Sequence, residues 1–140
     1  MTGEQSDALV LFGATGDLAH KKIFPSLYAM ALEGQLKVPV IGVASSAGDD
    51  EFLRGKVRAS LAEQVADAED VVVEHLLGQV RYVSGDYREP TVFDELAKVL
   101  EPCERPLFYL AIPPTLFDDV LDGLRRVGAN EGGRVVVEKP

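Results

Sequence analysis

The sequence predicts an α/β fold in which a doubly wound parallel sheet is covered by helices on both faces. Short apolar runs alternate along the chain with longer stretches of helical periodicity. A glycine turn, from Gly13 to Gly16, separates the first apolar run from the first helical stretch. The length of 140 residues is that of one domain with a buried core.

Five short runs are rich in Val, Ile, Leu and aromatic residues and have the length of buried strands. They cover residues 8–12, 38–44, 80–84, 107–111 and 134–138. A helical stretch joins each run to the next, so the strands are expected to lie parallel with right-handed crossovers. This arrangement is a Rossmann-type sheet, and residues 1–140 are interpreted as a single domain.

Helices are predicted between the strands by apolar residues that recur with helical spacing. They cover residues 17–33, 49–66, 91–100 and 114–127. The first is expected to end at Gly34 and to kink or restart at Pro25. Asp49 and Thr91 are suited to cap the N-termini of their helices. Residues 67–77 fit either a helix or a strand.

Composition excludes several classes of protein. The net charge of -9 argues against a nucleic-acid partner, which requires a clustered basic face. No apolar run approaches the roughly 20 residues that span a bilayer, so no membrane partner is expected. The polar N-terminus lacks a secretory pattern, and Cys103 is the only cysteine. A reducing, cytoplasmic location is therefore expected.

The glycine turn has the sequence of a nucleotide phosphate site, although its G-x-x-G-x-x-A spacing differs from the usual G-x-G-x-x-G. Gly13 permits a tight turn, and Gly16 allows the backbone to approach a pyrophosphate without a Cβ atom between them. Ala19 is small enough for the helix to pack closely on the strand. The helix N-terminus adds free N–H groups and a partial positive charge. Asp17 is interpreted either as a helix cap or as a cofactor contact.

Three segments together go beyond a generic dinucleotide fold. They are GATGDLAHKKIFP at residues 13–25, FYLAIPPT at residues 108–115 and VVEKP at residues 136–140. In sequence, order and separation they resemble the N-terminal NAD(P)-binding domain of the glucose-6-phosphate dehydrogenase family. The resemblance is weakest between residues 47 and 77.

The resemblance implies oxidation of glucose 6-phosphate at C1 to 6-phosphogluconolactone, with hydride transfer to NADP or NAD. This reaction opens the oxidative pentose phosphate pathway. The resemblance also implies that the cofactor-binding residues are Gly13, Ala14, Thr15, Gly16, Asp17, Leu18, Ala19, Ser45, Ala111, Ile112, Pro113, Phe117 and Lys139. Lys22 and Lys139 match the family's active-site lysines, whose charges would stabilise bound phosphate and the transition state.

Two departures from the family pattern concern the cofactor. The family has an arginine after the second strand that pairs with the 2′-phosphate of NADP, and Ser45 takes its place here. A hydroxyl carries no charge and cannot bind bidentately, so the preference between NADP and NAD stays open. Phe117 stands where some members have tyrosine, and only a hydroxyl contact would be lost.

The family's general base is a histidine in a second domain, and neither His20 nor His75 matches it. The same domain supplies the groups that bind glucose 6-phosphate. This chain is therefore interpreted as a fragment or truncated form in which the second domain is absent, and is expected to bind nucleotide without turnover. The resemblance also implies that the full-length protein would be a homo-oligomer. No spacing of metal ligands is seen, so no metal is expected.

Two alternatives belong to other functional classes. A truncated paralogue could bind dinucleotide without any catalytic role. A short-chain epimerase or reductase shares the Gly-Ala-Thr-Gly sequence but needs a Tyr-x-x-x-Lys pair. No tyrosine of this chain has a lysine four residues later; the tyrosines are Tyr28, Tyr82, Tyr87 and Tyr109. The second alternative is therefore disfavoured.

Overall fold

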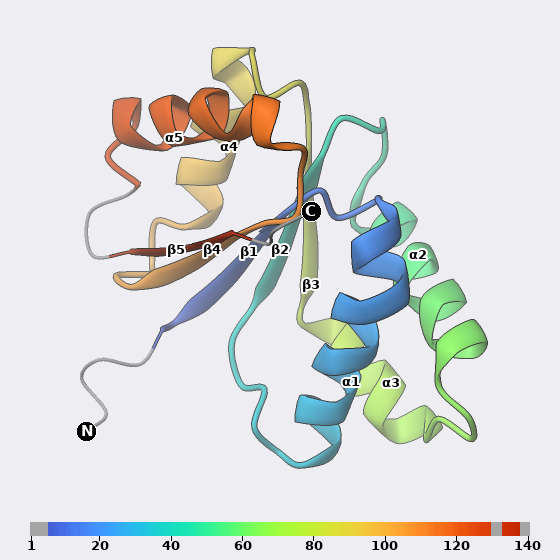
Figure 1. The fold of residues 1–140 in the computed structure, drawn as a ribbon. Coiled ribbons are helices and arrows are strands. Elements are labelled where there is room, and N and C mark those ends of the chain that lie inside the picture. The colour runs from blue at the N-terminus through green and yellow to red at the C-terminus, as the bar shows by residue number, and fades with distance from the viewer. Residues whose placement is uncertain (1–5, 130–132, 138–140) are drawn as a thin grey trace.

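The computed structural model describes residues 6–129 and 133–137, and these form a parallel five-stranded sheet with helices on both faces (Figure 1). The strand order is β3-β2-β1-β4-β5. The strands are β1 (Ala8–Phe12), β2 (Val40–Ala44), β3 (Val80–Ser84), β4 (Pro106–Leu110) and β5 (Arg134–Val137). Leu9 pairs with Val40 on one side of β1 and with Leu107 on the other. The predicted Rossmann-type sheet is confirmed.

The strand boundaries follow the sequence pattern closely. Strands β1 and β3 have the predicted bounds, β2 starts two residues later, and β4 is displaced by one residue. β2 begins later because residues 38 and 39 include Pro39, whose nitrogen cannot donate to a neighbouring strand. The predicted end of the fifth strand, at residue 138, lies outside the described residues.

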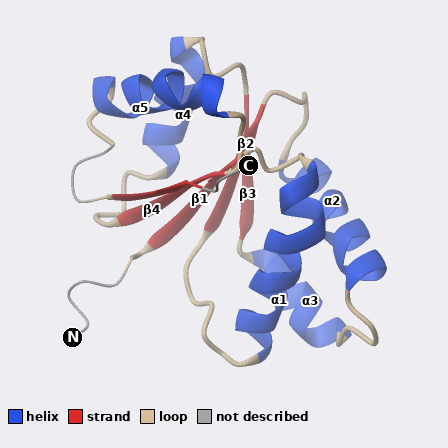
Figure 2. Ribbon diagram, in the orientation of Figure 1, coloured by secondary structure: helices blue, strands red, loops and turns tan. Residues whose placement is uncertain are grey.

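The helices divide between the two faces according to the order of the connections. Helices α1 (Phe24–Leu32), α2 (Asp50–Gln64) and α3 (Asp70–Gly78) cover one face, and α4 (Pro90–Val99) and α5 (Phe117–Arg126) cover the other (Figure 2). The helices switch to the second face after β3. There α4 connects β3, at one edge of the sheet, to β4, which lies on the other side of β1. The carboxyl ends of β1 and β4 therefore lie side by side where the winding reverses, which is the usual binding crevice of open α/β sheets.

The predicted discontinuity at Pro25 takes the form of a π-helical segment. Segment η2 (Ala19–Ile23) precedes α1, and the N–H of Phe24 donates to the carbonyl of Ala19, five residues earlier. The wider turn accommodates Pro25, which lies in the first turn of α1 and has no N–H to donate. The helix ends as predicted, with Gly34 at a φ of 73°.

The capping predictions had mixed outcomes. Asp49 caps α2 as predicted, because its Oδ1 accepts a 3.0 Å hydrogen bond from the N–H of Phe52. Thr91 does not cap α4, and this prediction was wrong. The helix already begins at Pro90, with Glu89 in the capping position, so Thr91 lies inside the first turn. The ambiguous stretch at residues 67–77 is resolved as helix α3.

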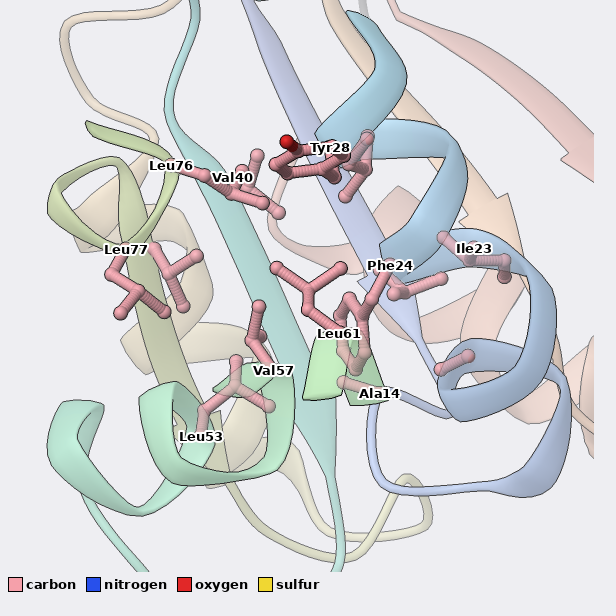
Figure 3. Close-up of a cluster of buried hydrophobic side chains, with 14 of the residues drawn as sticks. Ala14, Ile23, Phe24, Tyr28, Val40, Leu53, Val57, Leu61, Leu76 and Leu77 are labelled. Carbon is pink, nitrogen blue, oxygen red and sulfur yellow. The ribbon is translucent and has the colours of Figure 1, made fainter. Parts of the chain in front are cut away.

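Two hydrophobic clusters, one on each face of the sheet, anchor the strand that carries the glycine turn. Leu11 belongs to the cluster under α1, α2 and α3, and Phe12 belongs to the cluster under α4 and α5. Ala14 of the turn itself is buried in the first cluster, near Phe24 (Figure 3). The turn therefore starts from a rigid position. No helix within the described ranges is long and apolar enough to cross a membrane.

Candidate dinucleotide-binding site

Gly13 is packed against the end of β4 in a backbone conformation that favours glycine. Its φ is 86°, and a Cβ atom at this position would collide with the carbonyl oxygen of Ala111. The same atom would lie 3.1 Å from Cγ2 of Ile112. The N–H of Ala111 in turn donates a 3.0 Å hydrogen bond to the carbonyl of Phe12. The structure therefore brings Gly13, Ala111 and Ile112 together at the carboxyl ends of β1 and β4.

Several N–H groups of the turn bind to the protein itself. Those of Gly13 and Ala14 donate to the carbonyl oxygen of Val43, at 2.9 and 3.3 Å. The N–H of Gly16 donates to the carbonyl of Gly13 at 3.0 Å and closes the turn. These bonds fix the turn to the carboxyl end of β2 before any ligand is present.

Other N–H groups remain available at the start of the helix. The N–H of His20 donates to the carbonyl of Gly16 at 3.1 Å, which makes Asp17 the first helical residue. Apart from bonds within helices and strands, no backbone hydrogen bond in residues 6–129 and 133–137 has the N–H of Thr15, Asp17 or Leu18 as its donor. These are donors of the kind that bind phosphate at a helix N-terminus.

Gly16 and Asp17 leave the approach to these donors open. A Cβ atom at Gly16 would lie 3.4 Å from the carbonyl oxygen of Gly13 and would meet nothing else within 4 Å. The fold therefore does not itself require glycine at this position, whereas a ligand above the backbone would. Asp17 is exposed, and none of the side-chain hydrogen bonds found in the described part of the chain caps the helix through it. The negative charge of its carboxylate still interacts favourably with the partial positive charge of the helix N-terminus.

Tyr87 is a member of this site that the sequence analysis missed. Its hydroxyl accepts a 2.8 Å hydrogen bond from the N–H of Gly13 and donates a 2.9 Å bond to the carbonyl of Val43. The ring is buried against Phe12, with centroids 5.6 Å apart in an edge-to-face arrangement. Burial raises the pKa of Tyr87 to about 12, so the hydroxyl stays protonated. No local signal identifies this residue, since 74 positions separate it from Gly13.

Hydroxyl groups gather where the turn meets the end of β2. Thr15 Oγ1 and Ser46 Oγ are 3.3 Å apart, and the carbonyl of Ser46 accepts hydrogen bonds from the hydroxyls of Tyr82 and Ser84. Ser45, the predicted cofactor residue, is exposed on the same loop. Ser46 was not predicted, because its contact with Thr15 arises only when β1 and β2 pair.

Basic side chains flank the turn on two sides. Lys21 and Lys56 line a hollow of about 350 Å³ whose floor is formed by residues 14–17. His20 lines the same hollow, and its Nε2 lies 3.2 Å from Oε1 of Glu63. Lys56 was not predicted, because α2 brings it to the turn from a distant part of the sequence.

Lys22 lies on the other side of the helix from this hollow. It lines a groove of about 600 Å³ between α1 and strands β1 and β4, together with Leu18 and Tyr109. The two adjacent lysines, Lys21 and Lys22, therefore lie on different surfaces of the protein. The structure places Lys22 at this groove, whose lining also includes Ala8 and Leu107 near the amino ends of β1 and β4, and not over the turn.

The remaining predicted residues are less closely grouped. Ala19, the first residue of η2, is fully buried, as expected for a small residue at which the helix packs closely on the sheet. Pro113 is exposed, and its carbonyl accepts a 2.9 Å bond from the N–H of Leu116. Phe117 is half-buried against the cluster under α4 and α5. Lys139 lies outside the described residues. Among the residues that are described, no group of three potential metal ligands gathers.

The chain is similar in sequence to one family throughout its length. The family profile described as glucose-6-phosphate dehydrogenase, NAD binding domain, matches residues 10–140. Glucose-6-phosphate 1-dehydrogenase 1 of Mycobacterium tuberculosis is 38% identical over 141 residues, which cover 99% of this chain and 29% of the relative. Glucose-6-phosphate 1-dehydrogenase of Saccharomyces cerevisiae is 38% identical over 150 residues, which cover 98% of this chain and 30% of the relative.

Solved structures give the same result. The crystal structure of glucose-6-phosphate 1-dehydrogenase from Mycobacterium avium superposes with a TM-score of 0.92 at 38% identity, over 97% of this chain and 30% of that one. A glucose-6-phosphate dehydrogenase in complex with its substrate glucose-6-phosphate superposes with a TM-score of 0.84 at 36% identity, over 97% of this chain and 31% of that one. The chain thus spans about 30% of the length of these relatives.

Proposed function

Since the chain belongs to the glucose-6-phosphate dehydrogenase family and matches its NAD-binding domain, we propose that it binds a nicotinamide dinucleotide at the turn from Gly13 to Gly16. The observation that carries this proposal is the division of the backbone donors. The N–H groups of Gly13, Ala14 and Gly16 hold the turn in place, while those of Thr15, Asp17 and Leu18 are available to a ligand. A preformed turn binds phosphate without first paying for its own ordering.

The pyrophosphate would lie above Gly16, where the absence of a side chain leaves the backbone accessible. The partial positive charge of the helix N-terminus and the nearby Lys21 and Lys56 would attract it. Asp17 and Glu63 line the same hollow, and Glu63 is paired with His20, so the backbone donors of the helix N-terminus are the main attraction for phosphate here.

The two ends of the dinucleotide would lie on opposite sides of the turn. The adenosine end fits the hydroxyl-lined loop with Thr15 and Ser45, at the end of β2. Ser45 offers no charge to a 2′-phosphate, so this position does not select NADP over NAD. The chain is therefore proposed to use either NADP or NAD. The nicotinamide end would lie toward Ala111, Ile112 and Pro113, after β4, with Phe117 and Lys139 as further contacts.

In the family's reaction, hydride passes from C1 of glucose 6-phosphate to the nicotinamide. We infer that Lys22, which lines the groove between α1 and the sheet, together with Lys139 contributes positive charge next to that substrate. A base must accept the proton of the C1 hydroxyl. His20 is instead paired with Glu63, and His75 lies in α3. Residues 1–140 alone are therefore proposed to bind dinucleotide without turnover.

Titration calorimetry with NADP and with NAD tests the binding proposal directly. Heat of binding that saturates with one site per chain is expected, and no heat with either nucleotide would refute it. An assay with glucose 6-phosphate then tests the catalytic part, first with the chain alone and then with the remainder of a relative's chain supplied separately. Turnover only in the mixture supports a role in glucose 6-phosphate oxidation. Tight binding without restored turnover would instead indicate a non-catalytic dinucleotide-binding module.

A further inference from the structure

Tyr87 reaches the glycine turn from the opposite face of the sheet. The residue follows β3, and its ring lies in the cluster under α4 and α5, whereas the helix that follows the turn packs on the other face. Its hydroxyl forms a triangle with two backbone groups, accepting from the N–H of Gly13 at 2.8 Å and donating to the carbonyl of Val43 at 2.9 Å. One side chain thereby joins the segments that follow β1 and β3 to the end of β2.

These hydrogen bonds fix the position of Gly13 at the start of the turn. The N–H of Gly13 is shared between Val43 and Tyr87, so it points into the protein and away from any ligand. Ala111 blocks Gly13 from the other side, since its carbonyl oxygen leaves no room for a Cβ atom. Gly13 is therefore held between two fixed partners, and its position sets the direction of the N–H groups that follow.

We propose that Tyr87 is a positioning residue of the dinucleotide site, whose hydroxyl orients the turn so that the N–H groups of Thr15, Asp17 and Leu18 face the pyrophosphate. This inference rests on the proposed function. Tyr87 touches no ligand in this scheme, and it acts only through Gly13 and Val43. The buried ring, packed edge-to-face on Phe12, keeps the hydroxyl in place.

The chain offers a matched control in Tyr28. This tyrosine is also buried, and its hydroxyl likewise accepts a 2.8 Å hydrogen bond from a backbone N–H, that of Glu69. The bond joins α1 to the start of α3 and has no part in the glycine turn. Replacement of either tyrosine by phenylalanine removes one buried hydroxyl and preserves the ring. Tyr87→Phe loses the bond to Val43 as well, so Tyr28→Phe controls for the removal of a buried hydroxyl that accepts a backbone N–H.

The test compares NADP affinity, by calorimetry, in the wild type, Tyr87→Phe and Tyr28→Phe. We expect Tyr87→Phe to bind about fivefold to tenfold more weakly, because the start of the turn loses both hydrogen bonds of the hydroxyl, with Gly13 and with Val43. We expect Tyr28→Phe to bind as the wild type does. Equal affinities in all three proteins, or equal losses in both variants, would overturn the positioning role. Absence of binding by the wild type would instead refute the proposed function.

A second measurement needs only the wild type, in case Tyr87→Phe does not fold. Amide signals recorded by NMR during an NADP titration should shift strongly for Thr15, Asp17 and Leu18 and only weakly for Gly13. This difference is expected because the Gly13 donor is already committed to Tyr87 and Val43. A Gly13 signal that shifts as much as the other three would show that this donor turns to the ligand, and would overturn the inference.

Discussion

Gly13 and Ala111 are packed so closely that the carbonyl oxygen of Ala111 occupies the space of a Cβ atom on Gly13. The two residues come from the ends of β1 and β4, where the winding of the sheet reverses. Their contact closes the floor of the crevice in which open α/β sheets bind ligands. The glycine is therefore a requirement of the fold, in contrast to Gly16, whose surroundings are open.

Gly13→Ala is expected to lower the free energy of unfolding by more than about 2 kcal/mol. A left-handed backbone costs a non-glycine residue about 1 kcal/mol, and the collision with a backbone carbonyl adds to that cost. Gly34→Ala is the matched control, since Gly34 has a φ of 73° but nothing within 4 Å of a Cβ atom. Urea unfolding of both variants measures the difference. Equal losses would show that the contact with Ala111 is unimportant.

Gly16→Val is expected to separate folding from binding. The added Cβ atom would meet only the carbonyl oxygen of Gly13, at an ordinary contact distance of 3.4 Å, so the free energy of unfolding should change by less than about 1 kcal/mol. The same side chain would occupy the place proposed for the pyrophosphate, so dinucleotide binding should be abolished. Calorimetry with NADP and NAD gives the affinity, and Gly16→Ala should give an intermediate loss. Unchanged affinity in the valine variant would refute the assignment of the turn.

The order of elements and the glycine turn could be predicted because their signals are local. An apolar run marks β1, and the glycines that follow mark the turn. The prediction was less good where two local rules compete. At the start of α4, Thr91 is a good capping residue, but Pro90 favours the first helical position and determines where the helix begins. At Pro25 the sequence predicted an interruption but not its form, a π-helical segment.

Much of the candidate site depends on contacts that no local pattern encodes. Tyr87 meets Gly13 only because β3 and α4 bring it under the turn, and Lys56 reaches the same turn along α2. The pairing of Thr15 with Ser46 depends on the register between β1 and β2. The sequence could therefore predict which residues make the turn, but not which side chains hold it in place.

Asp7 gives a pH-dependent contribution to stability at the start of β1. Its carboxylate accepts hydrogen bonds from the N–H groups of Glu104 and Arg105, at 2.6 and 2.8 Å. Burial alone would raise the pKa of Asp7, but these bonds outweigh it and hold the pKa below its usual value. The stabilisation is thus fully present above the unfolded-state pKa of about 4 and is lost as the pH falls through the lower folded-state value.

Asp7→Asn should consequently be less stable than the wild type by about 1 kcal/mol at pH 7, because the bonds lose their charged acceptor. The difference should shrink steadily below pH 4, as the wild-type carboxylate is protonated. Urea unfolding of both proteins at several pH values between about 3 and 7 measures it. A difference that stays constant over this range would show that the charge of Asp7 makes no contribution.

Ser45→Arg is expected to raise the affinity for NADP relative to NAD by about tenfold. Ser45 is exposed on the loop after β2, next to the hydroxyl pair of Thr15 and Ser46, where the adenosine ribose is proposed to lie. A guanidinium group there can bind a 2′-phosphate bidentately, which a serine hydroxyl cannot do. NAD has no 2′-phosphate, so its affinity should remain nearly unchanged.

Ser45→Gln is the control, because glutamine adds length and hydrogen-bonding groups without the charge. The ratio of the NADP and NAD affinities, obtained by calorimetry at two salt concentrations, separates the two effects. For Ser45→Arg the gain in NADP affinity should diminish at high salt, since added ions screen an exposed charge pair. For Ser45→Gln the ratio should stay close to that of the wild type at both salt concentrations. An unchanged ratio in Ser45→Arg would show that the 2′ position of the bound adenosine lies away from this loop.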